Sequence, residues 1–154
     1  MGKIEAQDER SIIARVVRNC IMWALTKDVE MQKETMAQDE DLFYFWTGSS
    51  HTISGWEEHM KCFDQWLDPR FRAVRTEVRD LQIRLSRSGD VAWFSATLDD
   101  VVAWDGQASK YGEDLRWTGV LEKRDGRWVI VQMHASLAVD KVREIVMEEM
   151  QASD

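Results

Sequence analysis

The sequence has few of the residues on which common chemical motifs depend. It has two cysteines, Cys20 and Cys62, without a Cys-x-x-Cys pair, and three histidines, His51, His59 and His134, without zinc-ligand spacing. This pattern argues against a disulfide framework and a metal site, and we expect both cysteines to be buried, reduced thiols. The sequence contains no Gly-x-Ser-x-Gly elbow, glycine-rich phosphate loop or dinucleotide fingerprint, so we expect no cofactor.

Long apolar runs and an excess of positive charge are also lacking. No run approaches the ~20 residues of a membrane span, and the first residues, MGKIEAQDE, lack the apolar core of a signal peptide. Ala6 stands where myristoylation at Gly2 requires Ser or Thr. The net charge of −8 argues against nucleic acid or an anionic membrane as a partner. We therefore expect a cytoplasmic protein.

Tryptophan is unusually abundant in this chain. Eight tryptophans stand against one proline, and 44% of the 154 residues are hydrophobic. This length and composition fit one globular domain with a substantial core. Because no repeat, low-complexity tract or linker divides the chain, we predict a single domain over residues 1–154, with its core at about 8–138.

Hydrophobic periodicity predicts helices in the first part of the chain. Apolar residues recur at steps of three and four from Ile12 to Trp23, which indicates a helix that Asp8 would cap. Asp68-Pro69 would end a later helix. The elements expected here are a helix at 8–26, a short helix capped by Asp28 that ends before Asp39, an aromatic strand at 42–46 and a helix at about 54–67.

After Pro69 the period changes to the alternation that is typical of strands. The apolar phase of the first long strand shifts near Asp80, which predicts a β-bulge. Helices followed by a meander of antiparallel strands indicate an α+β fold. The further elements expected are strands at 71–86 and 91–104, a hairpin at 115–136 and an amphipathic helix at about 139–150.

The hairpin, LRWTGVLEKRDGRWVIVQMHAS, allows two registers around Asp125-Gly126. A two-residue loop places Trp117 opposite His134, whereas a three-residue loop, Arg124 to Gly126, places Trp117 opposite Met133. A slip of one residue turns every side chain of one strand to the other face. We favour the three-residue loop because it gathers the apolar residues on one face. The outer face would then hold Arg116, Thr118, Glu122, Trp128, Gln132 and His134.

The hairpin and parts of the preceding chain carry a family resemblance. The residues concerned are Thr118, Val120, Asp125-Gly126, Trp128, Val131, His134 and Ser136, together with Gly55, His59 and Gly89-Asp90. With these residues the chain resembles the NTF2-like superfamily, and within it the SnoaL-like and ketosteroid-isomerase-like proteins. The closing hairpin is also similar to that of the association domain of calcium/calmodulin-dependent protein kinase II.

The resemblance implies a cone-shaped, strongly bent antiparallel sheet wrapped around the first and third helices. In such folds the open end is a pocket, and the outer sheet face often forms a homodimer. The superfamily contains isomerases, dehydratases, cyclases, ligand binders and oligomerisation modules, so the fold alone does not select a function.

The resemblance also points to two ionisable residues. It would place Asp99 inward, where burial raises the pKa of a carboxylate and makes it a general base. The alternative is that Asp99-Asp100 is an ordinary polar pair near the exposed end of a strand. His59, on the apolar stripe of the third helix, matches a pocket histidine of the kinase association domain by its spacing from Gly55. It would form an acid/base couple with Asp99 or bind a carboxylate or enolate ligand. The alternative is a core histidine satisfied by the backbone.

Aromatic side chains are the candidates for contacts with a ligand. Tyr44 is suited to donate to a ligand oxygen, although the isomerase tyrosine lies on the first helix, where this chain carries Trp23. The alternative for most of the tryptophans is that they fill a wide cone and supply area at interfaces. The expected ligand-binding residues are Tyr44, Trp46, Trp56, Trp66, Trp93, Trp117 and Met133.

Three functions fit these observations. The first is a cofactor-independent isomerase or lyase that uses Asp99 and His59 on a small hydrophobic carbonyl compound. The second is a protein that binds such a molecule without changing it. The third, compatible with either, is a homodimeric assembly module whose outer sheet face carries Arg116, Trp128, Gln132 and His134.

Overall fold

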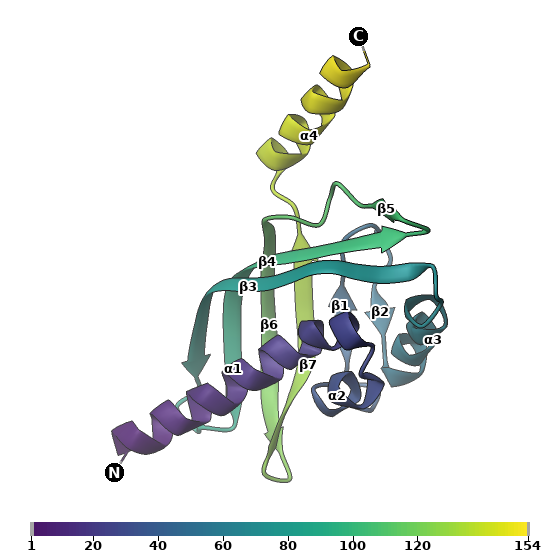
Figure 1. The fold of residues 1–154 in the computed structure, drawn as a ribbon. Helices are drawn as coiled ribbons and strands as arrows, with labels where there is room; N and C mark the ends of the chain where they lie inside the picture. The colour runs from purple at the N-terminus through teal and green to yellow at the C-terminus, as the bar shows by residue number, and fades with distance from the viewer. Residues whose placement is uncertain (1, 154) are drawn as a thin grey trace.

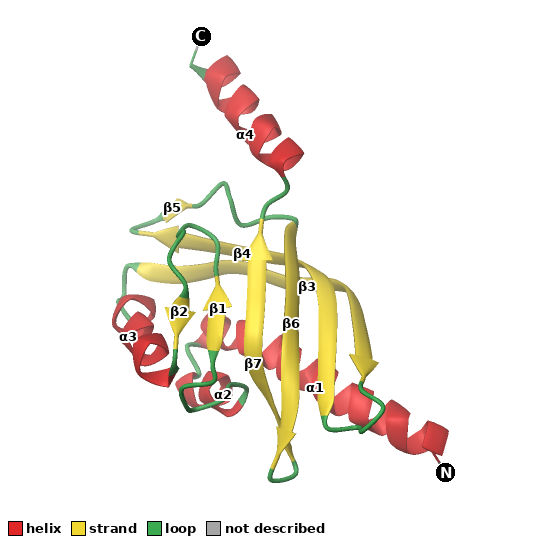
Figure 2. Cartoon of the chain, turned by 180° about the vertical axis from the view of Figure 1, so that it is seen from behind, coloured by secondary structure: helices red, strands yellow, loops and turns green. Residues whose placement is uncertain are grey.

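A 25-residue helix, α1 (Gly2–Thr26), crosses the concave side of a strongly bent sheet (Figure 1). The computed structural model describes residues 2–153, with side chains from residue 7 onward. Two shorter helices, α2 (Val29–Glu34) and α3 (Trp56–Trp66), follow α1 in the chain. Figure 2 looks onto the opposite face of the sheet, in front of which no helix lies. The α+β class and the bent sheet around the first helices are therefore confirmed.

The sheet has the strand order β2-β1-β7-β6-β4-β3, with β5 paired to β4. All pairs are antiparallel except β1–β7, which is parallel. The two-residue strands β2 and β5 are too short to show a period, so the sequence did not predict them. The strands are β1 (Phe43–Phe45), β2 (Ile53–Ser54), β3 (Phe71–Leu85), β4 (Val91–Trp104), β5 (Gln107–Ala108), β6 (Leu115–Arg124) and β7 (Arg127–Ser136).

The helix ends agree only in part with their sequence signals. Helix α1 begins at Gly2, so Asp8 lies within it and the prediction that Asp8 caps it is wrong. The residues before Asp8 lack an apolar stripe, and periodicity therefore could not reveal this start. Asp28 does cap α2, because its carboxylate accepts a hydrogen bond from the Met31 backbone N–H at 3.1 Å. Helix α3 follows Gly55, whose φ of 85° favours glycine.

Two bulges bend the long strand β3. Asp80, with a φ of 52°, lies at a register shift between Arg79 and Gln82, which confirms the predicted bulge. A second shift, between Ala73 and Arg75, left no clear signal in the sequence. Because each bulge bends and twists its strand, the β3–β4 pair curves across α1 (Figure 1).

The closing hairpin has a two-residue loop. Asp125 and Gly126 have φ values of 49° and 76°, and Arg124 pairs with Arg127, so the predicted three-residue loop is wrong. Closer to the open end, the register shifts by one residue because Val131 is an extra residue in β7.

This bulge changes which side chains meet. Trp117 lies opposite Ala135 and Thr118 lies opposite His134, so neither predicted register holds along the whole hairpin. Trp128 is 3% exposed, and its indole N–H donates to Glu9 of α1. The prediction that Trp128 lies on the outer face is therefore wrong, whereas His134 does point outward.

Trp117 occupies the centre of the core on the inner face of the hairpin. It is fully buried, and its ring centroid lies 4.8 Å from that of Phe94 and 6.2 Å from that of Trp46. Beside it, Gly119 pairs with Phe94 across the strands. A Cβ at Gly119 would lie 2.5 Å from Phe94 Cε1 and 2.8 Å from the Gln132 carbonyl oxygen, so the packing requires glycine here.

The last helix, α4 (Val139–Ala152), projects away from the sheet (Figure 1). None of its residues is buried. Ion pairs of 3.1 Å join Lys141 to Asp114 and Lys110 to Glu149, and they tie α4 to the segment before β6. The predicted terminal helix is thus confirmed. Within residues 2–153, no helix has the length and apolar character that a membrane crossing requires.

We expect Gly119→Ala to destabilise the fold. The added methyl group must displace Phe94 or the backbone of β7, which costs about 1–3 kcal/mol in a close-packed core. Urea unfolding measures this loss. Thr118→Ala, at the neighbouring position on the outer face, is the matched control and should change the free energy of unfolding much less. Equal stability of Gly119→Ala and the wild type would contradict the packing described here.

Candidate functional site

The sheet and helices α1 and α3 enclose a cavity on the concave side. This inner cavity, of about 70 Å³, has mostly aromatic and apolar walls. A wider pocket of about 860 Å³, here called the mouth, lies next to it. Both spaces are lined by Trp46, Trp66, Phe71, Asp100 and Val102. The arrangement is suited to a small hydrophobic molecule that enters through the mouth.

Asp100 is the carboxylate of the inner cavity. It pairs with Thr76 of β3 on the same side of β4 as the buried Phe94 and Leu98. Burial raises the pKa of Asp100 to about 6, although its interaction with the Trp46 side chain acts in the opposite direction. A carboxylate with this pKa exchanges protons readily near neutral pH, as a general base or acid must.

The backbone of Asp100 is held by the segment that precedes β6. Its N–H donates to the Gly112 carbonyl oxygen at 2.7 Å. A Cβ at Gly112 would lie 2.4 Å from the Asp100 carbonyl oxygen, so the two backbones approach this closely only because residue 112 is glycine. Strand β3 on one side and the segment around Gly112 on the other therefore fix the backbone position of Asp100.

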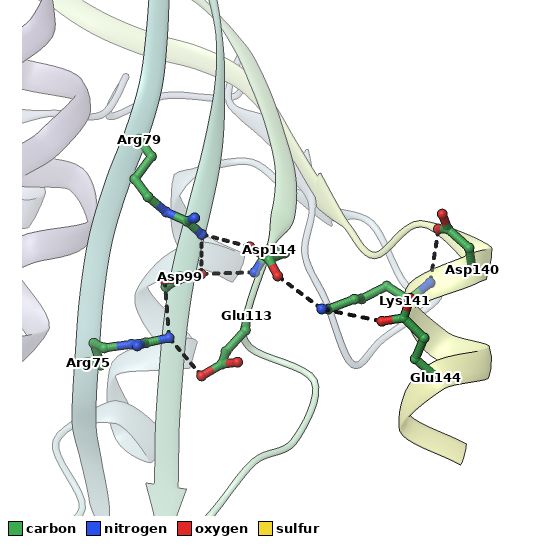
Figure 3. A network of polar contacts seen from close by, with 8 residues as sticks. All are labelled: Arg75, Arg79, Asp99, Glu113, Asp114, Asp140, Lys141 and Glu144. Atoms are coloured by element: carbon green, nitrogen blue, oxygen red, sulfur yellow. Dashed lines mark hydrogen bonds and ion pairs between the residues drawn. The ribbon is translucent and has the colours of Figure 1, made fainter. Parts of the chain in front are cut away.

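Asp99 lies on the opposite side of the sheet, so its predicted inward orientation is wrong. Its side chain is 5% exposed and forms ion pairs with Arg79 at 2.8 Å and Arg75 at 3.2 Å. It also accepts a hydrogen bond of 2.9 Å from the backbone N–H of Asp114. Figure 3 shows this cluster, in which Arg75 also contacts Glu113. Asp99 is therefore ion-paired outside the cone and does not meet His59.

The alternation of β4 contained a signal that would have placed Asp100 correctly. The phase that includes Asp100 consists otherwise of Ala92, Phe94, Ala96, Leu98, Val102 and Trp104, all apolar, whereas the phase of Asp99 includes Ser95 and Thr97. The more apolar phase of a half-buried strand faces the core. Trp93 shares the phase of Asp99 and is 47% exposed on the outer face, so its predicted place in the cone is also wrong.

His59 lies in a buried hydrogen-bonded chain. Its Nε2 is 3.0 Å from Oε1 of Gln32, and its Nδ1 is 2.8 Å from the Tyr44 hydroxyl. Because an amide oxygen can only accept, Nε2 carries the proton and Nδ1 accepts from Tyr44. Burial lowers the pKa of His59 to about 4. The imidazole is thus neutral and satisfied by two side chains, in place of the backbone partner that the sequence reading considered.

The residues expected to bind a ligand divide into three groups. Tyr44, Trp46, Trp66 and Met133 line the inner cavity. Trp56 stacks on His59 at 5.2 Å between ring centroids and, like the buried Trp117, supports the wall without lining either space. Trp93 lies outside the cone. The sequence reading missed Asp100, Gln32 and Phe71 as lining residues. Trp23, which it placed on the first helix, also lines the inner cavity. In the part of the chain that the structure describes, no cluster of His, Cys, Asp or Glu is suited to a metal ion.

Comparisons with known proteins agree with this architecture. The family model described as the SnoaL-like domain matches residues 13–140. An NTF2-like protein from Cytophaga hutchinsonii is similar in structure, with a TM-score of 0.66, 15% identity, and coverage of 84% of this chain and 98% of that one. The association domain of CaMKII from C. elegans is similar with a TM-score of 0.60, 20% identity, and coverage of 88% and 97%. A comparison with curated protein sequences gives no match.

His59 and Asp100 should give stability opposite dependences on pH. The pKa of His59 falls from 6.5 to about 4 on folding, so its contribution is present above pH 6.5 and is lost as the pH falls. The pKa of Asp100 rises from 3.8 to about 6, so the fold loses stability as the pH rises through this range and regains it on acidification.

Urea unfolding of the wild type, Asp100→Asn and His59→Gln at two pH values tests this compensation. When the pH falls from 7 to 5, we expect His59 to lower the free energy of unfolding by about 2 kcal/mol and Asp100 to raise it by about 1 kcal/mol. Acidification should therefore destabilise Asp100→Asn more than the wild type, and it should stabilise His59→Gln. Three parallel pH profiles would contradict the burial of these two groups.

Proposed function

We propose, because this chain belongs to the SnoaL-like domain family, that it binds a small hydrophobic carbonyl compound in the cone and moves a proton on it. The observation that carries this proposal is the position of Asp100 in an aromatic cavity. There, burial raises the pKa of its carboxylate to about 6. The role first expected of Asp99 passes to its neighbour, and the reaction class stays that of a cofactor-independent isomerase or lyase.

In this reaction, Asp100 accepts a proton from the carbon next to the carbonyl group, and the C–H electrons form an enolate. The Trp46 indole N–H and the Gln32 amide, both in the cavity wall, are suited to donate to the enolate oxygen. Return of the proton to another carbon completes an isomerisation, whereas departure of a β-substituent with the C–X electron pair completes an elimination. Asp100 returns the proton to the product or to the leaving group.

His59 has a supporting role in this proposal. With its pKa near 4, it stays neutral at pH 7, and its Nδ1 holds the Tyr44 hydroxyl at 2.8 Å. A neutral imidazole that already accepts one hydrogen bond and donates another cannot easily supply a proton to the ligand. We therefore assign His59 to shaping the cavity wall together with Tyr44.

Hydrogen–deuterium exchange on a simple aryl ketone tests the chemistry without knowledge of the natural substrate. In D₂O near neutral pH, the wild type should speed deuterium uptake at the methyl group of acetophenone, as followed by proton NMR. Asp100→Asn should lose about 10²-fold or more of this rate, the usual contribution of a general base.

Asp99→Asn is the matched control for this experiment, because it changes the adjacent carboxylate outside the cone. We expect it to keep the rate within about threefold of the wild type, in contrast to the loss expected for a general base. Equal rates for Asp100→Asn and the wild type would remove the catalytic role. Binding of the ketone without exchange above buffer would favour the alternative of a non-catalytic ligand-binding protein.

A second candidate function is homo-oligomerisation through the outer sheet face. This face carries three large exposed side chains, Phe43, Phe45 and Trp93, which are 42–48% exposed. Arg116, Gln132 and His134 lie on the same face, and the His134 ring is 5.6 Å from Phe45. A structurally similar protein is an association domain, which supports a second copy of this chain as the partner.

Light scattering coupled to size-exclusion chromatography tests the assembly proposal. We expect the wild type to be a dimer and Trp93→Glu to shift it toward a monomer, because a buried interface does not tolerate an unpaired charge. Glu148→Gln, on the exposed side of α4, serves as a control for the effect of a surface charge change. A monomeric wild type at micromolar concentration would refute this second function.

A further inference from the structure

We infer that the cone selects its ligands by charge. It binds molecules whose inserted end is uncharged, and it rejects molecules whose inserted end is a carboxylate or a phosphate. The inference rests on the proposed function, because it specifies the ligand class of the same site. It follows from the distribution of charged side chains over the two sides of the bent sheet.

The inside of the cone carries negative charge without a compensating cation. Among the described residues that line the inner cavity and the mouth, Asp100 is the acidic residue and none is lysine or arginine, while the histidines are His59 in the cavity and His134 at the mouth. His59 does not supply a positive charge near neutral pH, since burial lowers its pKa to about 4. An anionic ligand would therefore exchange its hydration for a space that holds a like charge and no ion-pair partner.

The arginines nearest in the fold are held on the other side of the sheet. Arg75 and Arg79 belong to β3, but their guanidinium groups turn outward to Asp99 (Figure 3). Glu113 and Asp114 complete the same cluster. Because these cations already have carboxylate partners, they are not available to an acid inside the cone.

Cations near the mouth are also engaged. Lys110 pairs with Glu149 and Lys141 pairs with Asp114, both at 3.1 Å. Arg116 is a third cation near the mouth. It donates at 3.3 Å to Ser136 Oγ and to the Leu137 carbonyl oxygen, and both of these residues line the mouth. The Arg116 side chain lies on the outer face, so we expect it to hold Ser136 and Leu137 in place without contacting a ligand.

Acetophenone and benzoate are matched probes of this selection, since they share a ring and differ in charge. Their dissociation constants are measured by one-dimensional proton NMR of the ligand during titration with the full chain at pH 8. For the wild type, we expect benzoate to bind at least about tenfold more weakly than acetophenone, the scale of a like-charge interaction in a partly buried site.

Two variants locate the origin of the preference. Asp100→Asn keeps the shape of the side chain and removes its charge, so the ratio of the two constants should fall severalfold. The preference that remains reflects the dehydration of benzoate in a space without an ion-pair partner. Arg116→Gln should leave the ratio unchanged. Circular dichroism at the same pH confirms that each variant is folded before the titration.

The outcomes separate the inference from the function on which it rests. If benzoate binds the wild type as tightly as acetophenone does, or if the ratio of the two constants is undiminished in Asp100→Asn, the charge selection is wrong even though the cone binds ligands. If acetophenone binds without exchanging deuterium, the proposed chemistry fails and the charge selection stands. If neither probe binds, the cone is not a site for small ring compounds and both proposals fall.

Discussion

The alternation of β4 at Asp99 and Asp100 is the constraint on which the site depends. Successive residues of a strand point to opposite faces, so two adjacent carboxylates are placed in opposite environments by one peptide unit. Asp99 meets two guanidinium groups on the outside. Asp100 meets aromatic walls on the inside, and its pKa is raised. The same strand therefore holds, at adjacent positions, an ion-paired carboxylate on the outside and a carboxylate with a raised pKa on the inside.

The bulges make this arrangement possible. Without the shifts in β3 at Ala73/Arg75 and Arg79/Gln82, the strand would not curve over α1, and Asp100 would face a flat, open surface. The extra residue Val131 in β7 plays the same part in the hairpin. It turns Trp128 toward α1 and keeps Trp117 and Met133 on the inner face. The pocket is thus a product of irregular strands as much as of apolar patterning.

These irregularities also mark the limit of what the sequence could predict. Strong periodic patterns identified α1, α3 and the long strands, and a phase change in the apolar pattern identified the bulge at Asp80. The bulge at Val131 interrupts a run of apolar residues, so no change of phase announces it, and the register of the hairpin was wrong on both sides of it. Tyr44, Trp46 and His59 line the inner cavity. The sequence singled out the first two by their aromatic segment and His59 by its place on the apolar stripe of a helix.

The orientation of β4 was wrong for a different reason. Its two phases differ by only a few polar residues, and Trp93 made the outer phase look apolar. Trp93 lies on the outer face, for which the assembly is proposed, and it is 47% exposed. The sequence therefore located the carboxylate pair, and the apolar residues that alternate with Asp100 indicated which of the two enters the cone. The family resemblance had placed Asp99 there instead.

The most direct test of the account is the titration of Asp100 itself. Carbon-13 NMR of the side-chain carboxyl groups, with the Asp100 resonance assigned by its loss in Asp100→Asn, follows its protonation as the pH changes. We expect a midpoint near 6. A midpoint near 4, the ordinary value of an exposed aspartate, would show that Asp100 lies in water and would contradict the carboxylate in an aromatic cone on which the proposed function rests.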